Sequence, residues 1–204
     1  MKQESASKTK LLDTAIDLVW ASSYGAVSVD DICVKAGVNK GSFYYFFKSK
    51  SDLAVAAFER HWDAKRERMD RIFSPQVPPL ERLDQYMGAI IDDQKARFRA
   101  LGKMPGCPFC SLGSELSTQD EKIRVKVENI LGRQMKYVES LVRDLAAEGL
   151  IQSPNHKELA EEIVSYIGGT LMQAKIENSV KHVERMGHGV RRILGLKEVT
   201  PIAA

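Results

Sequence analysis

Apolar side chains recur every three or four positions along most of this 204-residue chain, which is the spacing of one buried helix face. The first such stretch is residues 7–22, whose apolar positions are Leu11, Leu12, Ala15, Ile16, Leu18 and Val19. No stretch alternates apolar and polar residues as a half-buried strand does, and no internal repeat is present. The pattern therefore predicts an all-α protein of about nine helices.

Capping residues and helix breakers set the expected boundaries of these helices. Four residue pairs have the spacing that opens a helix: Ser28/Asp31, Ser49/Asp52, Thr118/Glu121 and Asn155/Glu158. The proline-rich segment 74–79 and the segment 102–108 interrupt the pattern. We expect helices at about residues 7–22, 29–36, 40–46, 50–73, 80–101, 108–116, 119–148, 156–183 and 189–194.

The overall composition limits the classes of protein to which this chain can belong. With 30 Lys and Arg against 27 Asp and Glu, the net charge is only +3, so any attraction for nucleic acid must be local. Three cysteines are too few for a disulfide scaffold. The first ten residues are too polar for a secretory signal, and no run approaches the roughly 18 apolar residues of a membrane span. We therefore expect a cytoplasmic protein without a membrane partner.

Aromatic and cationic residues concentrate in residues 37–50, GVNKGSFYYFFKSK. Gly37 suits a turn between two helices, and Asn39 suits the cap of the second. Phe43 and Phe47 are four residues apart and are expected in the core. Three short helices with such a turn predict a helix-turn-helix whose third helix enters the major groove of DNA.

The lysines of this region favour a nucleic-acid partner, because they neutralise phosphates and release counterions, while tyrosine hydroxyls donate to phosphate oxygens. No acidic residue interrupts residues 34–51. We therefore expect four lysines to cluster without a counter-charge: Lys35, Lys40, Lys48 and Lys50.

The same residues resemble the N-terminal domain of the TetR family of transcriptional regulators. The resemblance covers residues 9–60 and rests on Ile16 and Leu18, Gly25, Ser28-Val29-Asp30-Asp31-Ile32, Ala36-Gly37-Val38, Gly41-Ser42-Phe43-Tyr44, Phe47-Lys48-Ser49-Lys50 and Leu53. The family often has His where this chain has Tyr45 or Phe46. The remainder of the chain is similar to the family only in its all-helical layout and its length.

The resemblance and the side-chain chemistry together indicate a DNA-contact set: Ser28, Asn39, Lys40, Gly41, Ser42, Tyr44, Tyr45, Lys48 and Lys50. Lys40 and Ser42 lie early on the third helix, where side chains reach base edges or phosphates. Gly41 allows close backbone approach to the DNA. We expect Tyr44 to donate to a phosphate, and Lys50 to face the DNA backbone at the N-terminus of the fourth helix.

A regulator of this family would use its C-terminal part to dimerise and to bind a small-molecule effector. A candidate dimer stripe on the eighth helix comprises Ile163, Ile167, Gly168, Leu171 and Ala174, with intrachain core as the alternative. Residues that could line an effector pocket, each with core packing as the alternative, are Trp62, Tyr86, Ile90, Phe98, Cys107, Phe109, Cys110, Tyr137, Tyr166 and Met172. The implied partners are a pseudo-palindromic DNA operator, a second copy and an unidentified effector, with no cofactor and no metal.

Cys107 and Cys110 form a second distinctive feature, in GCPFCSLGSEL at 106–116. Pro108 suits the first helical position, which makes Cys107 the N-cap and Cys110 the third residue of the helix. The pKa of a thiol falls at a helix N-terminus, and some TetR-family members with a similar Gly-Cys segment sense reactive compounds. The alternatives are simple packing, and metal binding, for which two thiols alone supply too few ligands. Cys33 is expected in the core.

These observations give one principal hypothesis and two alternatives. The principal hypothesis is a non-enzymatic, dimeric repressor with a DNA-binding domain at residues 1–50 and an effector-binding and dimerisation domain at residues 51–204. It releases its operator on binding the effector, with a thiol-sensing component. One alternative is a thiol-redox or small-molecule enzyme on a helical scaffold, supported only by Cys107 and Cys110. The other is a helix-turn-helix protein that binds small molecules without a ligand switch.

Overall fold

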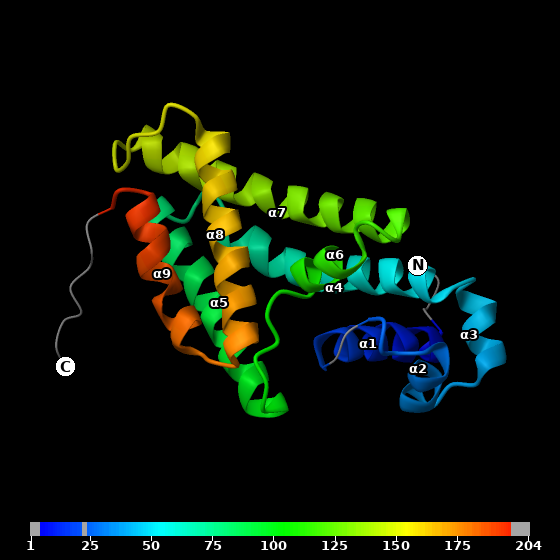
Figure 1. Ribbon diagram of the computed structural model, residues 1–204. Coiled ribbons are helices and arrows are strands. Elements are labelled where there is room, and N and C mark those ends of the chain that lie inside the picture. Colours follow the sequence, from blue (N-terminus) through cyan, green and yellow to red (C-terminus); the bar gives the residue numbers. More distant parts are fainter. Residues whose placement is uncertain (1–4, 22–23, 197–204) are drawn as a thin grey trace. The chain divides into compact units, whose positions relative to one another are not determined.

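The computed structural model describes residues 5–21 and 24–196, and these residues form nine α-helices and no strand (Figure 1). The helices are α1 (Ala6–Ala21), α2 (Val29–Ala36), α3 (Lys40–Phe46), α4 (Lys50–Ile72), α5 (Pro79–Leu101), α6 (Pro108–Leu116), α7 (Glu121–Ala147), α8 (His156–Glu177) and α9 (Lys181–Ile193). The all-α prediction is therefore confirmed. Throughout the described residues, each helix is too short or too polar to cross a lipid bilayer.

The chain divides into two compact units. Unit 1 comprises residues 1–67 and 107–131, and unit 2 comprises residues 68–106 and 132–204. Unit 1 thus contains α1, α2, α3 and α6, whereas unit 2 contains α5, α8 and α9; α4 and α7 contribute to both. The expected functional division at residue 50 stays a prediction, but α6 belongs to the same unit as the helix-turn-helix.

The core of unit 1 forms where α1, α2 and α3 pack on one another and α6 packs on α1. Leu11, Phe43 and Leu53 are completely buried there. Burying a side chain of this size contributes about 1.5–3 kcal/mol each to folding. These contacts fix the orientation of α3, the helix that carries the candidate DNA contacts.

In unit 2, α8 packs along α9, and α9 also packs against α5. The ring of Tyr166 on α8 lies directly over Gly189 on α9, where an added Cβ would come within 1.9 Å of the tyrosine oxygen. An ion pair joins the buried Arg82 on α5 to the half-buried Asp144 on α7, with 2.6 Å between Nη1 and Oδ2. The glycine at position 189 leaves room for the Tyr166 ring and so permits the close approach of α8 and α9.

Helix boundaries differ from the sequence prediction in α7, α8 and α9, and α9 begins at Lys181, eight residues before the expected start at residue 189. Helix α7 is capped by Asp120, whose carboxylate accepts a hydrogen bond from the N–H of Ile123 at 3.2 Å, and not by Thr118. Helix α8 ends at Glu177, because Asn178 adopts a left-handed conformation with φ of 48°. The predicted Val19 side chain and the predicted end of the first helix at residue 22 lie outside the described residues.

Candidate nucleic-acid interface and reactive thiols

Local hydrogen bonds position α3 after α2, as the capping residues predicted. Gly37 takes a left-handed conformation, with φ of 63°, and its N–H donates to the carbonyl of Val34. The side chain of Asn39 then accepts a hydrogen bond from the N–H of Ser42 at 2.8 Å, which caps α3. A left-handed glycine after one helix and a side-chain cap on the next make a tight turn. The expected helix-turn-helix is therefore present.

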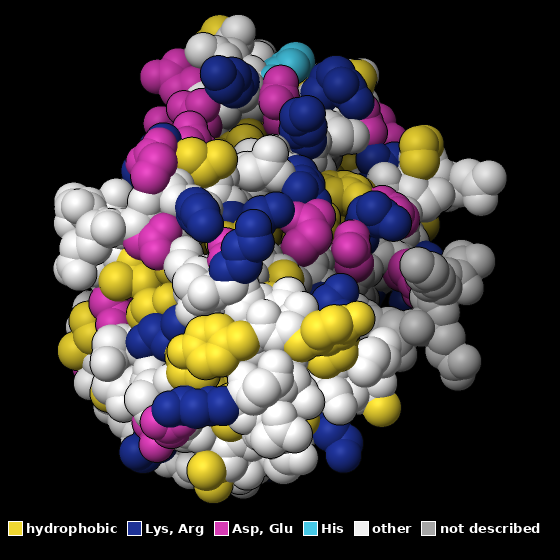
Figure 2. Space-filling view, turned by 90° about the vertical axis from the view of Figure 1, so that its right-hand side faces the viewer, with side chains coloured by type: hydrophobic (Ala, Val, Ile, Leu, Met, Phe, Trp, Pro, Cys, Tyr) yellow, Lys and Arg dark blue, Asp and Glu magenta, His cyan; other side chains and the backbone are white. Residues whose placement is uncertain are grey.

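Helix α3 has one buried face and one exposed face. Phe43 and Phe47 are 0% and 5% exposed, as expected for core residues, whereas Tyr44 and Tyr45 are 56% and 82% exposed. Lys48 is also exposed. The face of the molecule that carries α3 shows Lys and Arg side chains beside large hydrophobic side chains (Figure 2). Two phenol hydroxyls and a cation are thus available to a phosphate backbone.

The lysines of this region do have a counter-charge. Lys40 at the start of α3 pairs with Asp30 of α2, with 2.7 Å between Nζ and Oδ1, and both side chains are more than half exposed. The expectation of an unopposed lysine cluster is therefore wrong. Because solvent screens such an exposed pair, a DNA phosphate can compete with Asp30 for the ammonium group.

Lys50 points into the protein and not toward solvent. Its ammonium donates hydrogen bonds to the carbonyls of Tyr24, at 2.8 Å, and Val27, at 2.7 Å, and lies 3.9 Å from the centre of the Tyr24 ring. Burial lowers the pKa of Lys50 and raises the pKa of Tyr24 to about 12, where nearby Asp120 and Glu115 add to the effect. Lys50 thus fixes the turn between α1 and α2 to α4, in place of the phosphate contact that the sequence suggested.

Glu115 on α6 also holds this turn. Its carboxylate accepts hydrogen bonds from the N–H groups of Gly25, at 2.7 Å, and Tyr24, at 3.2 Å. This role of Glu115 was not predicted from the sequence, because Gly25 and Glu115 are 90 residues apart and no local pattern links them. The turn at residues 24–27 is therefore fastened both to α4 and to α6.

The remaining predicted DNA contacts have other tasks or stay open. The hydroxyl of Ser28 donates to Asp31 at 2.6 Å within a complete capping box, so it is already occupied. Gly41 is exposed at the start of α3, and the side chain of Ser42 is half-buried. A Cβ at Gly41 would meet only the side chain of Asn39, at 3.2 Å. The N-terminal end of α3 is therefore uncrowded.

Cys107 and Cys110 take the helix positions that their spacing predicted. Cys107 is the N-cap of α6, Pro108 is the first helical residue, and both thiols are half-buried. Cys107 makes no capping hydrogen bond of standard geometry. The thiol of Cys110 donates a hydrogen bond to the sulfur of Cys107. This hydrogen bond lowers the pKa of Cys107 to about 6, and the nearby amides of Cys110 and Phe109 and the charge of Lys65 add to the effect. The same interaction and burial raise the pKa of Cys110. Cys107 is thus the nucleophilic member of the pair, whereas Cys33 is buried.

Comparison with known proteins identifies the fold and the helix-turn-helix. Residues 11–57 match the family described as bacterial regulatory proteins, tetR family. Residues 79–190 match the tetracyclin repressor-like C-terminal domain. The chain belongs to the TetR family.

Relatives of this TetR-family chain are transcriptional regulators. The transcriptional regulator AcuR of Cereibacter sphaeroides is 26% identical over 85% of this chain and 78% of its own length. The repressor NemR of Escherichia coli is 24% identical over 96% of this chain and 98% of its own. A TetR regulatory protein from Rhodobacter sphaeroides has the same fold, with a TM-score of 0.82 at 24% identity, covering 93% of this chain and 99% of that one. The reduced form of E. coli NemR has a TM-score of 0.80 at 24% identity, covering 95% and 100%.

The predicted effector-pocket residues of this TetR-family protein are distributed over both units. In unit 1, Phe109 packs edge-on against Phe58 of α4 at 5.2 Å between ring centres, and Trp62 is buried. In unit 2, Tyr86 packs on Phe73 and accepts a hydrogen bond from Gln134, and Tyr137 donates to Asp70. The other predicted members in unit 2 are half-buried: Ile90, Phe98, Tyr166 and Met172.

A groove between α6 and α7 reaches one of the thiols. It has a volume of about 420 Å³ and is lined by Phe109, Cys110, Gly113, Ser114, Ser117, Arg124, Val127, Glu128 and Leu131. The helices are close here, because a Cβ at Gly113 would lie 3.0 Å from a methyl group of Val127. The groove belongs to unit 1, so a compound bound in it would lie in the same unit as the helix-turn-helix.

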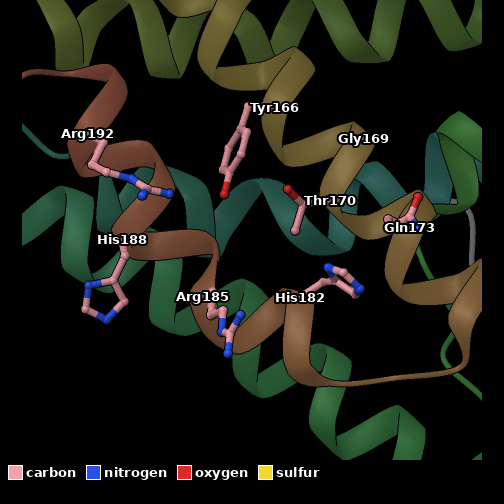
Figure 3. Close-up of a pocket in the computed structure, with 8 residues that line it drawn as sticks. All are labelled: Tyr166, Gly169, Thr170, Gln173, His182, Arg185, His188 and Arg192. Atoms are coloured by element: carbon pink, nitrogen blue, oxygen red, sulfur yellow. The ribbon is translucent and has the colours of Figure 1, made fainter.

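The predicted dimer stripe lies inside its own chain. Ile163, Ile167, Leu171 and Ala174 are at most 6% exposed, so these side chains form part of the core of unit 2; Gly168 is half-buried. Another face of α8 and α9 carries a groove of about 680 Å³ (Figure 3). Its lining residues are Tyr166, Gly169, Thr170, Gln173, His182, Arg185, His188 and Arg192. Any contact between copies through α8 would therefore use this other face.

Proposed function

We propose that this regulator is a homodimeric repressor that binds a pseudo-palindromic operator through α3 and leaves it when an effector binds or a compound reacts with its thiols. The observation that carries the proposal is the exposed face of α3. Tyr44 and Tyr45 face solvent on α3, which the buried Phe43 anchors, and the exposed Lys48 follows directly after the buried C-cap residue Phe47. Hydroxyl donors on a rigidly held helix, with a cation directly after it, suit phosphate contacts on both sides of a groove.

Within this proposal the contacts divide by chemistry. Tyr44 and Tyr45 donate to phosphate oxygens, and Lys40 and Lys48 supply charge. Gly41 and Ser42, at the open start of α3, lie where a reading helix meets base edges. Two relatives are named as transcriptional repressors, DhaR of a Mycobacterium strain and NemR of Escherichia coli, which supports repression as the direction of control.

A second copy is expected on the exposed face of α8 and α9. The groove on this face carries the exposed Arg185 and Arg192, and α8 exposes Glu161 and Glu162. An isologous interface presents the same patch twice, so basic residues of α9 in one copy can meet acidic residues of α8 in the other. Replacing Arg185 and Arg192 by glutamate should weaken the dimer in sedimentation equilibrium, and an unchanged dimer would exclude this surface.

The α6–α7 groove and Cys107 support the effector part of the proposal. The groove is largely apolar and contacts Cys110, whereas Cys107 is the more nucleophilic thiol. One solved relative, NemR, is described by its redox state, as the reduced form. The curated relatives are regulators, which favours this proposal over a thiol-redox enzyme.

Fluorescence anisotropy with genomic DNA fragments bound by the protein tests the whole proposal. We expect specific binding with a steep salt dependence, lost in a Tyr44→Phe/Tyr45→Phe variant but kept in a Val34→Ala variant, because Val34 is exposed on α2. Candidate electrophiles and apolar compounds should then weaken binding. Absence of specific binding to any fragment would refute the proposal. Specific binding that no compound weakens would favour a helix-turn-helix protein without a ligand switch.

A further inference from the structure

Two cysteines occupy a pair of positions in the first turn of α6 whose side chains turn toward each other. In a capping box, the side chain of the N-cap residue and that of the third helical residue face each other across the first turn. Cys107 and Cys110 hold these two positions. We propose that Cys107 and Cys110 form a reversible intramolecular disulfide, and that α6 transmits its formation to the DNA-binding helices through Glu115. The inference rests on the proposed function as a DNA-binding repressor.

The backbone geometry allows the disulfide without large movement. Cys107 is the N-cap and Cys110 the third helical residue, so the two lie within one turn of backbone, with Cα atoms about 5–6 Å apart, inside the range of about 4.4–6.8 Å that a disulfide bridges. The thiol of Cys110 already donates to the sulfur of Cys107. Both thiols are half-buried, and Cys110 also borders the α6–α7 groove, so a small oxidant can reach the pair.

The two thiols have different roles because their surroundings differ. Cys107 favours the thiolate, which is stabilised chiefly by the hydrogen bond from the Cys110 thiol and further by the amides of the first turn and Lys65, while Cys110 retains its proton. The thiolate is the form that attacks an oxidant. Cys107 is therefore the residue that reacts first, and Cys110 is the resolving thiol.

The oxidant is a two-electron oxidant, a hydroperoxide. The thiolate of Cys107 attacks the terminal oxygen of a hydroperoxide, the O–O bond breaks, and the alkoxide takes up a proton, which leaves Cys107 as a sulfenic acid. The sulfur of Cys110 then attacks that of Cys107, the S–O bond breaks, and hydroxide leaves with the thiol proton as water. Two cysteine sulfurs are oxidised to a disulfide, and one hydroperoxide is reduced to an alcohol and water.

Helix α6 is suited to carry a change from its first turn to its last. It is only nine residues long, Phe109 is held against Phe58, and Gly113 lies against Val127. Disulfide formation removes the thiolate charge and brings the sulfurs to about 2.05 Å, so the first turn must tighten. Because close-packed neighbours on two sides restrict local adjustment, a displacement of the first turn moves the whole short helix.

Glu115, in the last turn of α6, makes the connection to the DNA-binding helices. Its hydrogen bonds to Gly25 and Tyr24 hold the turn before α2, and the Tyr24 carbonyl and ring hold Lys50 at the start of α4. A hydrogen bond of 2.7 Å is lost when its ends separate beyond about 3.5 Å. Oxidation therefore releases the turn that orients α2 and α3, and DNA affinity falls.

The test treats reduced, purified protein with one equivalent of hydrogen peroxide. Peptide mapping is expected to show a Cys107–Cys110 disulfide with Cys33 still a free thiol, and anisotropy is expected to show about a tenfold or larger loss of operator affinity that dithiothreitol restores. Cys107→Ser should keep its operator affinity after treatment with the oxidant. Cys110→Ser should form no intramolecular disulfide that dithiothreitol can reduce. A disulfide between two copies, or an intact affinity after disulfide formation, would overturn the inference.

The route through Glu115 has its own test. Glu115→Gln should weaken operator binding of the reduced protein and remove most of the further loss on oxidation, whereas Glu121→Gln, an exposed control in the same unit, should behave like wild type. If Glu115→Gln does not fold, the coupling can be measured in the wild type instead, as the effect of operator DNA on the redox potential of the two thiols. Operator DNA should then raise the midpoint potential of the thiol pair by about 30 mV for each tenfold loss of affinity. An unshifted potential would overturn the coupling. Reduced wild type that never binds DNA would refute the proposed function instead.

Discussion

Replacing Lys50 by methionine asks whether this lysine holds the protein together or contacts DNA. Methionine keeps the aliphatic stem and removes the ammonium, so the carbonyls of Tyr24 and Val27 lose a charged donor at 2.8 and 2.7 Å. A hydrogen bond to a charged group contributes about 1.5–3 kcal/mol, and a cation–π contact about 0.5–1 kcal/mol. Lys50 is only half-buried and water can reach the freed carbonyls. We therefore expect the free energy of unfolding to fall by about 2 kcal/mol.

The matched control is Lys48→Met, two residues earlier and exposed. Urea denaturation followed by circular dichroism should show no loss of stability for Lys48→Met. In anisotropy titrations against salt, the slope of log affinity falls by about 0.9 for each lost phosphate contact. Lys48→Met should lose this amount, whereas Lys50→Met should bind more weakly with an unchanged slope.

The opposite pattern would refute the reasoning. If Lys50→Met unfolded like wild type and lost about 0.9 from the slope, its ammonium would lie on a DNA phosphate and not on the turn at residues 24–27. The salt slope thus separates a DNA contact from a structural contact in a way that affinity alone cannot.

Three further predictions concern the core, the helix packing and the thiol. Asp144→Asn should lower the free energy of unfolding, measured in urea, by about 2–3 kcal/mol, because it removes the charged partner of Arg82, whose side chain is only 4% exposed. An unchanged free energy of unfolding would mean that water pairs with the guanidinium. Gly189→Ala should cost about 1–3 kcal/mol because its Cβ meets the Tyr166 ring, and Tyr166→Ala in the same chain should recover part of the loss. Alkylation of Cys107, followed by peptide mass spectrometry, should rise with pH to half its maximum near pH 6, because the thiolate forms there. Because the pKa of Cys107 is lower in the folded protein, the stability that its thiolate contributes should be lost as pH falls through about 6. Half-maximal alkylation near pH 8.5 would instead show that Cys107 is an ordinary thiol.

Features that depend on neighbours in the chain could be predicted from the sequence. The caps at Ser28, Asn39 and Asn155 and the left-handed Gly37 each involve groups within a few residues of one another. The alternation of buried Phe43 and exposed Tyr44 follows from helix periodicity alone. These local features were sufficient to define the helix-turn-helix.

Features that depend on distant partners could not be predicted. The apolar stripe on α8 correctly indicated a buried face, but periodicity does not say whether the covering surface belongs to the same chain or to another. Lys50 reads as a basic residue at a helix start, and only the carbonyls 23 and 26 residues earlier give it a structural task. Glu115 has its partners 90 and 91 residues away.

The position of α6 changes where a signal can act. In the sequence, residues 107–116 fall in the C-terminal two-thirds, which suggests a sensor separate from the DNA-binding domain. In the structure they belong to unit 1, together with α1, α2 and α3. Coupling between two sites needs an element with two arrangements that both sites bias. Here that element can be the turn at residues 24–27, which both Glu115 and Lys50 hold. This turn joins α1 to α2, and both helices pack on α3, so a change at the thiols has a route to α3 within one compact unit.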